Sequence, residues 1–577
     1  MSDIVTVICR GTTPIISVPP ASSASVLKLQ KSEATQVASS VIWTASSSLI
    51  IVMAANLAQL LMRELTAPLA WFLLLLPLFV LLRRCYPFRE KRAARKKQQE
   101  IDDHHPLPPS PPALPVLGHL HLVRLRIPHV SLRSIAEKHG EDLLLLRLGA
   151  MPALVVSSTR AAEAVLRTHD HVFASRPPSV AAEVVTYGRH DIGLAPYGEY
   201  WRQAKKLVTT HLLSVRKVRS FRHAREEEVS AVVARIGEAA AAGTLVDVHE
   251  LVGTFTNDLA CRAVMGKSLR SEGRNELFRE VAGGASVLLG GFSVEEFFPF
   301  LTRFGVLSKV VLAKCERVRK RWDGLLDRLI DDIESNVKKD EDDHHFIHTL
   351  LSVGHEHGFT RGQMKAILLD VFFGMGTAAS VLEYTVIQLL QNPLVMTKLQ
   401  AEVRSCVRQQ GEDIVSEDDL NNMPYLRAVI NESLRLRPAT PILTPRFSMA
   451  SCVVDGHVVP AGVRVLVNLW AIGRDARFWG DDAEEFVPER FLDGGGAAHV
   501  SFRGNDFQFL PFGAGRRQCP GINFGMAQVQ VMLANLVHRF DWEMPPGKVA
   551  RDIDMSGDLG LVVHRKHKLL LFPKLCV

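Results

Sequence analysis

The chain has 577 residues, of which 47% are hydrophobic and 22% charged, so it can bury a large core and is neither a disordered nor a fibrous protein. Its formal net charge is +7, but residues 83–97 hold eight Lys or Arg residues against Glu90 alone, so the rest of the chain is balanced. Because no basic stripe lies elsewhere, the sequence predicts no nucleic-acid partner.

The first predicted element is a membrane anchor at residues 65–82. This run is almost wholly apolar and is about long enough to cross a bilayer. The basic linker at 83–105 follows it directly, and an excess of Lys and Arg on one flank places that flank in the cytosol. We therefore expect a single-pass protein in contact with membrane lipid, with everything after the linker on the cytosolic side.

Residues 1–61 form an N-terminal extension whose status the sequence leaves open. Residues 1–40 are rich in Ser, Thr and Ala and contain few acids, which weakly resembles a transit peptide and keeps plastid targeting as an alternative. Met62 opens M-R-E-L-T-A-P-L-A-W-F, an ordinary start for a membrane-anchored chain. We therefore favour Met62 over Met1 as the first residue.

Residues 106–577 are predicted to form a catalytic domain that is mainly α with small β-sheets. Amphipathic stretches such as 225–240 and 313–337 predict helices. Residues 142–157 predict strands, and residues 452–467 predict a hairpin followed by a strand. The eight cysteines are scattered without a C-x-x-C pair, which fits free thiols in a reducing compartment better than disulfides.

Two clusters of acids and histidines, at residues 102–105 and 340–345, have the residue types that bind metal ions. Consecutive side chains do not easily converge on one ion, and both clusters lie in polar linker sequence. We therefore interpret both clusters as solvated loops.

The stretch D-V-F-F-G-M-G-T-A-A-S at residues 370–380 has two glycines spaced as at the start of a dinucleotide-binding loop. That loop needs a preceding strand and an acid about 20 residues later. Residues 384–400 contain no acid and residues 363–390 contain no proline, so one long helix is predicted instead. Its small residues would admit either a flat ligand or the close packing of another helix.

The segment F-L-P-F-G-A-G-R-R-Q-C-P-G, residues 509–521, delivers one cysteine, Cys519, to an apolar helix predicted to begin near Pro520. Free N–H groups at a helix N-terminus lower the pKa of a thiol, and the thiolate is then a nucleophile or a metal ligand. No histidine lies near enough in sequence to act as the base of a cysteine protease. Glycines are expected to let this backbone approach something flat and bulky; they are Gly513, Gly515 and Gly521.

The same segment resembles F-x-x-G-x-R-x-C-x-G, the haem-binding loop of the cytochrome P450 monooxygenases. The matching residues are Phe512, Gly515, Arg517, Cys519 and Gly521. The resemblance implies a cytochrome P450 fold and haem b (iron protoporphyrin IX) as cofactor, held by these residues. It makes Cys519 the metal ligand, Arg517 a partner of a haem propionate, and Phe512 a shield for the sulfur. A thiolate ligand favours oxygen–oxygen bond cleavage.

Further matches follow the order of the family and extend the resemblance over residues 106–577. The motif E-S-L-R supplies Glu432 and Arg435 on one helix face, and P-E-R-F supplies Arg490. In the family these three residues form a buried structural network, and buried charges require such mutual pairing.

Three more residues are implied to contact the haem. Arg446 lies in T-P-R-F-S, and Trp201 lies in E-Y-W-R-Q-A-K. Four residues after the tryptophan, the family has arginine whereas this chain has Lys205. The ammonium group of lysine is a point charge, whereas the guanidinium of arginine is a planar fork. Lys205 is nevertheless expected to face a haem propionate.

The helix over the oxygen-binding face of the haem has the family pattern [AG]-G-x-[DE]-T-[TS], whose acid and alcohol help to deliver protons. Laid on M-G-T-A-A-S at residues 375–380, the pattern has Ala378 in place of the acid and Ala379 in place of the threonine. Thr377 or Ser380 is expected to substitute through water, since the stretch is one residue short. Because the alcohol is missing at position 379, Ala379→Thr is expected to raise the amount of product formed per NADPH consumed.

Segments such as L-A-P-Y-G-E-Y-W-R-Q-A-K-K look like plant microsomal enzymes of the A type, and they are most similar to grass enzymes that hydroxylate indole and its oxidised derivatives on the benzoxazinoid pathway. This resemblance implies a monooxygenase in the endoplasmic reticulum membrane that hydroxylates a small apolar substrate with O2 and electrons from NADPH–cytochrome P450 reductase. The missing acid and alcohol leave an isomerase, a dehydratase or a catalytically impaired member as alternatives. Substrate contacts are expected from residues 182–193, 370–380, 439–444 and 557–561.

Overall fold

The computed structural model describes the chain from residue 105 onward, apart from short internal stretches and residue 577. The described residues are 105–139, 142–268, 270, 274–290, 292, 294–299, 306–336, 345–408 and 414–576. The predicted N-terminal extension, the anchor and the linker up to residue 104 lie outside the described residues. The two acid–histidine clusters also lie outside them, apart from His105 and His345.

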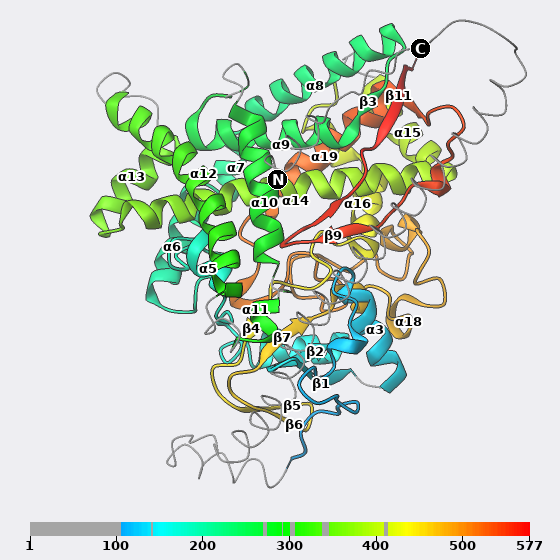
Figure 1. Ribbon diagram of the computed structural model, residues 1–577. Helices are drawn as coiled ribbons and strands as arrows, with labels where there is room; N and C mark the ends of the chain where they lie inside the picture. Colours follow the sequence, from blue (N-terminus) through cyan, green and yellow to red (C-terminus); the bar gives the residue numbers. More distant parts are fainter. Residues whose placement is uncertain are drawn as a thin grey trace, which may run out of the picture. The chain divides into compact units, whose positions relative to one another are not determined.

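Helices make up most of the described chain, as the sequence predicts, and Figure 1 shows them gathered in its upper part. The α-helices are α3 (Pro128–His139), α4 (Thr159–Glu163), α5 (Val180–Val185), α6 (Glu199–His211), α7 (Val215–Ser220), α8 (Arg222–Ala242), α9 (Val248–Met265), α10 (Arg274–Leu289), α11 (Val294–Phe297), α12 (Val306–Asn336), α13 (Phe346–Glu356), α14 (Arg361–Gln391), α15 (Pro393–Arg408), α16 (Pro424–Leu436), α17 (Leu469–Ile472), α18 (Ala476–Trp479) and α19 (Ile522–Arg539). One π-helical turn, η2 (Ala164–Thr168), and five 3-10 turns join them; the latter are η1 (Leu120–Leu122), η5 (Asp419–Asn422), η6 (Pro488–Phe491), η7 (Gly515–Arg517) and η8 (Ala550–Asp552).

The strands form small sheets, which lie mainly in the lower part of Figure 1. They are β1 (Leu143–Leu148), β2 (Met151–Val156), β3 (Val246–Asp247), β4 (Arg446–Phe447), β5 (Cys452–Val454), β6 (His457–Val459), β7 (Arg464–Val467), β8 (Phe540–Glu543), β9 (Gly557–Leu559), β10 (Val563–Arg565) and β11 (Leu570–Leu575). The sheet orders are β1-β2-β7-β4, β3-β11-β8, β5-β6 and β10-β9, with β2 and β7 parallel. The prediction of strands at 142–157 and of a hairpin followed by a strand at 452–467 is confirmed.

The long helix predicted for residues 363–390 is α14, which is helical without interruption from Arg361 to Gln391. A capping box starts it: the Thr360 hydroxyl accepts the Gln363 N–H, and the Gln363 side chain accepts the Thr360 N–H at 2.7 Å. Its glycines lie inside this continuous helix, and the described element directly before it is helix α13 and not a strand, so they are not a dinucleotide loop. The helix is apolar enough to cross a membrane by composition, but 71% of its most apolar window is buried inside the protein.

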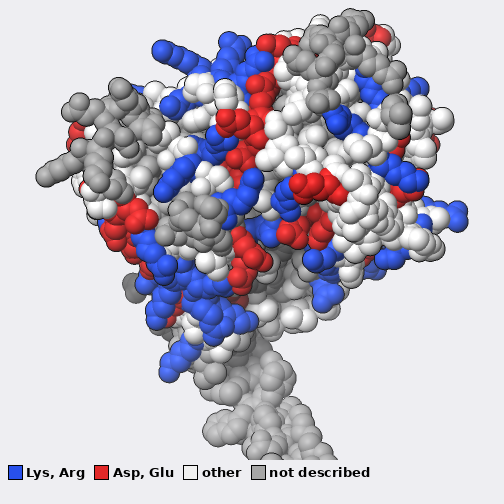
Figure 2. All heavy atoms as spheres, turned by 90° about the horizontal axis from the view of Figure 1, so that it is seen from above, with Lys and Arg blue, Asp and Glu red and all other residues white. Residues whose placement is uncertain are grey.

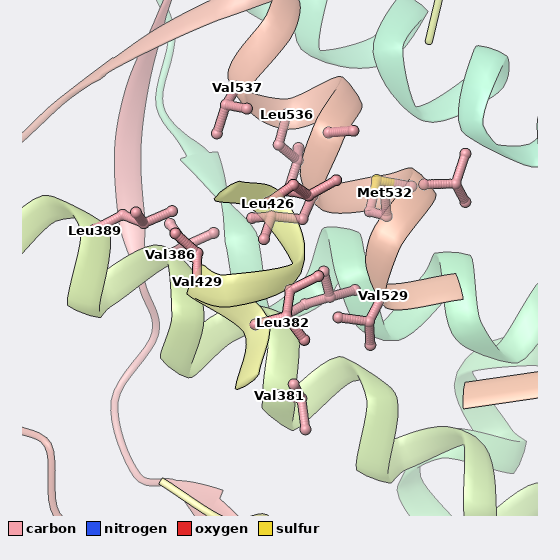
Figure 3. Packing of buried hydrophobic residues seen from close by; sticks show 14 of the residues in the cluster. Val381, Leu382, Val386, Leu389, Leu426, Val429, Val529, Met532, Leu536 and Val537 are labelled. Carbon is pink, nitrogen blue, oxygen red and sulfur yellow. The ribbon is translucent and has the colours of Figure 1, made fainter. Parts of the chain in front are cut away.

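The C-terminal half of α14 packs against α16 and α19 in a hydrophobic core (Figure 3). Leu382, Val386 and Leu389 recur at helical spacing on α14 and are almost wholly buried. Leu426 on α16 and Met532 on α19 lie against them in Figure 3. Truncating a buried leucine to alanine costs about 2–5 kcal/mol. This core therefore holds α14 in place for whatever its N-terminal half contacts.

Charged side chains of both signs are spread over one face of the molecule. Figure 2 shows Lys and Arg interleaved with Asp and Glu over the face that it draws. Proteins that bind nucleic acid through their surface gather basic residues on one face or stripe. The mixed pattern on this face accords with the balanced charge of the chain beyond residue 97.

Candidate functional site

A cavity of about 320 Å³ lies between the middle of α14 and the loop that leads into α19. All four stretches from which substrate contacts are expected contribute to its wall, for example through Ile192, Val371, Ala439 and Leu561. Most of the remaining lining is apolar as well. An enclosed apolar cavity with a few convergent polar groups is the usual form of a small-molecule site.

Cys519 lies in the wall of this cavity. Its N–H donates a hydrogen bond to the Phe512 carbonyl at 3.0 Å, and its side chain is enclosed by protein with its exposed surface toward the cavity. The prediction of a lowered thiol pKa is wrong. Burial raises the pKa of Cys519, and this outweighs the lowering by the Gly521 N–H and by Lys205. The helix also begins later than predicted, at Ile522 rather than near Pro520, so the sulfur lies outside its first turn.

The glycines of this loop have different roles. Gly513 and Gly521 line the cavity, and a Cβ on Gly521 would lie 3.8 Å from the Cys519 sulfur. Gly515 is not part of the cavity wall. At its φ of +66° a Cβ would lie 2.4 Å from the Leu166 carbonyl oxygen and 2.5 Å from Asp170 Oδ1. The expectation that Gly515 faces a flat ligand is therefore wrong, because it is protein packing that leaves no room for a side chain there.

Four cations lie close together in the cavity wall: Arg176 and Arg446 are buried, and Lys205 and Arg517 are half-buried. Burial, followed by repulsion from Arg517, lowers the pKa of Lys205 to about 8. Burial and repulsion from Arg446 lower the pKa of Arg517 to about 9. Burial also lowers the pKa of Arg446 and Arg176. A group of mutually repelling buried cations is stabilised by an anion, which identifies this part of the cavity as an anion-binding region.

The cations also hold the loops of the site together. The Arg517 guanidinium donates to the carbonyls of Ala174 at 2.7 Å and Ala195 at 2.6 Å and lies 4.2 Å from the centre of the Trp201 ring. Lys205 donates to the Arg516 carbonyl at 2.6 Å and also lies over Trp201, at 5.1 Å. The point charge of a lysine thus joins the same cluster as the arginine two residues before Cys519.

The predicted oxygen-side residues separate into two groups on α14. Thr377 and Ala378 line the cavity, together with Gly374 one turn earlier. Ala379 instead packs against the hydrophobic core, and the Ser380 hydroxyl donates to the Val563 carbonyl at 2.9 Å. The expectation that a threonine at position 379 would supply the missing alcohol is therefore wrong, because that position faces away from the cavity. Thr377 is the hydroxyl that this helix presents to it.

The three residues of the predicted charge network lie together in the structure. The Arg435 guanidinium donates two bonds to the Glu432 carboxylate, both at 2.7 Å, and Arg490 Nε donates to it at 3.0 Å. Arg435 also donates to the carbonyls of Gly473 and Ala483 at 2.6 Å. The network thereby joins α16 to the chain that leads into the cysteine loop.

Two carboxyl groups of the site were not singled out from the sequence. Asp170 accepts a bond from Arg446 at 2.8 Å and another from the Arg516 guanidinium at 2.8 Å. Asp370 is the first residue of the stretch 370–380, in which the sequence-based predictions concern the glycines, the alanines, Thr377 and Ser380. It lies in the cavity wall. The only sequence signal for Asp370 is an acid in an otherwise apolar helix. For Asp170 no local signal exists, because its partner Arg446 is 276 residues away.

These residues fit haem b. Its macrocycle is apolar, its iron takes a soft thiolate ligand, and its two propionates are anions. In this cavity Cys519 would bind the iron, while Arg446, Arg517 and Lys205 would face the propionates. When bound, haem supplies the binding and reductive activation of O2. Among the described residues, the four cations of the cluster have one carboxylate as a hydrogen-bond partner, Asp170 on Arg446, and otherwise bind carbonyls; this excess of positive charge supports the fit.

Several known proteins are similar to this chain in sequence or in fold. Residues 108–572 match the cytochrome P450 family. Indole-2-monooxygenase from Zea mays is 51% identical over 471 residues, which are 81% of this chain and 87% of the relative. Indolin-2-one monooxygenase from Zea mays is 48% identical over 493 residues, 83% of this chain and 90% of the relative. A zebrafish cytochrome P450 solved with abiraterone has a TM-score of 0.63 at 24% identity, over 78% of this chain and 100% of that chain. As the resemblance predicts, the chain belongs to the cytochrome P450 family.

Proposed function

We propose that this protein is a monooxygenase that hydroxylates a small, flat, indole-type plant metabolite, such as indole or indolin-2-one, with O2 and electrons derived from NADPH. The observation that carries the proposal is a single apolar cavity whose wall holds Cys519, the cation cluster and the Thr377 hydroxyl. The two relatives from Zea mays, named for indole and indolin-2-one, support the substrate class.

The apolar wall and the hydroxyl have separate tasks in this proposal. Ile192, Val371, Val381 and Leu561 exclude water from the cavity and hold a flat apolar ring by contact. Thr377 Oγ accepts and passes on a proton by way of water during oxygen activation. Ser380, whose hydroxyl is bonded to a backbone carbonyl away from the cavity, has a structural role instead.

An isomerase, a dehydratase or an impaired enzyme was the alternative that alanines at positions 378 and 379 left open. Thr377 in the cavity wall supplies the alcohol that this alternative assumed to be missing. We therefore do not adopt it.

We further propose that the protein lies in the endoplasmic reticulum membrane with its catalytic region in the cytosol, and that NADPH–cytochrome P450 reductase donates its electrons. The apolar run at residues 65–82 and the basic residues after it support the anchor and its orientation. Membrane lipid is then a partner of the anchor.

Turnover in membranes that contain the full chain and the reductase tests the function. Indole, indolin-2-one, a terpene and a phenol are each incubated with and without NADPH, and the products are read by mass. We expect an NADPH-dependent gain of one oxygen atom with an indole-type substrate and no such product from Cys519→Ala. An isomeric or dehydrated product formed without NADPH would contradict the proposal.

A further inference from the structure

A short segment, Asp191 to Leu194, forms part of the cavity wall next to Asp370 of α14, and we call it the roof segment. Side chains bind its backbone from several elements. Asp370 Oδ2 on α14 accepts the N–H groups of Ile192 and of Gly193, the latter at 3.2 Å. The Trp201 indole N–H donates to the Ile192 carbonyl at 3.0 Å, and Arg176 Nε donates to the Gly193 carbonyl at 2.8 Å. Ile192 and Gly193 thus lie in the cavity wall at a position fixed mainly by other residues.

Two carboxyl groups meet at this segment. A Cβ on Gly193 would lie 3.4 Å from Asp191 Oδ2 and 3.5 Å from Asp370 Oδ1. The nearest guanidinium, Arg176, gives its hydrogen bonds to the carbonyls of Gly193, Thr444 and Pro445 and none to either carboxyl. Two carboxyls enclosed together without a hydrogen-bonded cation do not both ionise readily.

The surroundings assign the charge to Asp191. Asp191 interacts favourably with three guanidinium groups, those of Arg176, Arg189 and Arg517. Burial, and next the charge of Asp191, raise the pKa of Asp370 well above that of an ordinary carboxyl, against the lowering by the roof N–H groups and Arg176. Tyr200 and His190 are further titratable side chains nearby, in ring contact with each other at 5.0 Å; burial and both carboxyls raise the pKa of Tyr200. Burial raises the pKa of Asp191 too, against the lowering by the Leu194 N–H and Arg176, but Asp370 is the carboxyl that is raised further by the charge of its neighbour, so we place the proton of the pair on Asp370.

The proton belongs on Oδ1, the oxygen that accepts no hydrogen bond from the roof segment. Both lone pairs of Asp370 Oδ2 are used by the two roof N–H groups, which leaves Oδ1 for the hydrogen. The side chain is half-buried although protein encloses it, because part of its surface faces the cavity that it lines. A neutral O–H donor in an apolar wall requires an acceptor, and a ligand oxygen would supply one.

We propose that Asp370 is a neutral carboxyl that positions the roof segment with Oδ2 and, through its Oδ1–H, donates a hydrogen bond to an oxygen of the substrate. It thereby selects an indole that already carries a carbonyl oxygen, such as indolin-2-one, over indole itself, which has no oxygen acceptor. This inference rests on the proposed indole-type function. The reaction class that supplies such a substrate is an earlier oxygenation of the same ring.

Ligand binding to Asp370 variants tests the proposal. The full chain is titrated with indole and with indolin-2-one, and each Kd is read from the change in the haem absorption spectrum. Asn at position 370 keeps an acceptor for the roof and an N–H donor for the cavity, so Asp370→Asn should hold both Kd values within about threefold of wild type. Asp370→Ala loses both groups and should weaken indolin-2-one about tenfold more than indole, the size of one good neutral hydrogen bond. Asp331→Asn and Asp331→Ala, the same changes at an exposed acid of α12 that lies outside the cavity wall, should leave both Kd values unchanged.

Three results would overturn the proposal. If Asp370→Asn raises the Kd of indolin-2-one as much as Asp370→Ala does, the Asp370 carboxyl acts as an anion. If Asp370→Ala raises the Kd of indole and of indolin-2-one by the same factor, Asp370 only positions the roof segment. Should the alanine variant not fold, infrared difference spectra decide, because the band of a neutral carboxylic acid must be present in wild type and absent from Asp370→Asn. If neither ligand changes the wild-type spectrum, the proposed substrate class fails and the selectivity with it, while the infrared band still decides the protonation state.

Discussion

Replacement of Asp170 by asparagine removes the anion that faces a buried arginine. The Arg446 side chain is 2% exposed, and it donates hydrogen bonds to Asp170 at 2.8 Å and to the Ala514 carbonyl at 2.6 Å. Breaking a buried ion pair costs about 3–5 kcal/mol, and asparagine retains one acceptor oxygen, so we expect a loss of about 3 kcal/mol. Against a total stability of about 5–15 kcal/mol, this loss should visibly lower the yield of folded protein.

Urea unfolding of the purified chain, followed by circular dichroism and haem absorbance, measures this loss. Glu163→Gln is the control, because Glu163 pairs with Arg167 on the surface at 2.6 Å and an exposed pair contributes about 0–1 kcal/mol. Combining Asp170→Asn with Arg446→Met should cost less than the sum of the two single changes. If Asp170→Asn shifts the midpoint no further than Glu163→Gln does, Arg446 is compensated by another group and the reasoning is refuted.

Four further outcomes follow from the site and its surroundings. Glu432→Gln should lower the free energy of unfolding by about 3–5 kcal/mol in the same urea experiment, because it leaves the buried Arg435 without its anion and Arg490 with Asp482 alone. Cys519→Ala should abolish the thiolate-type spectrum of the reduced carbonyl complex, and persistence of that band would contradict the ligand assignment. Thr377→Ala should lower the product formed per NADPH consumed, whereas Ser380→Ala should not; equal effects would place neither hydroxyl at the reaction. A hydrogen bond to a carboxylate on α14 raises the pKa of His249, so its stabilisation is complete below about pH 6.5 and is lost as pH rises through the raised pKa; His249→Gln should flatten that part of a stability profile.

Local sequence patterns predicted those features of the fold and the site that depend on residues close together in the chain. The spacing of Glu432 and Arg435 places both on one helix face, and the absence of proline from 363–390 predicts the long helix α14. The motif order also placed Cys519 in the site. Each of these follows from residues within one element or one loop, where sequence distance and spatial distance agree.

The remaining features depend on tertiary structure. The sign of the thiol pKa shift was wrong because burial, which no local motif shows, outweighs the nearby N–H group. Which of the oxygen-side residues faces the cavity depends on its angular position around α14. Ala379 lies about 200° around the helix from Thr377, so an error of one residue in the alignment changes which side chain is predicted to face the cavity. The anchor at 65–82 stays a prediction.

The roof segment is held by bonds to its main chain. Asp370, Trp201, Arg176 and Arg517 all bind amide or carbonyl groups, which every residue type other than proline provides in the same form. The side chain at position 192 can therefore change size or shape while the backbone of the roof segment stays at the same distance from the loop that carries Cys519. Descendants of this gene can acquire new substrates by single substitutions there, without first having to rebuild the scaffold that positions them.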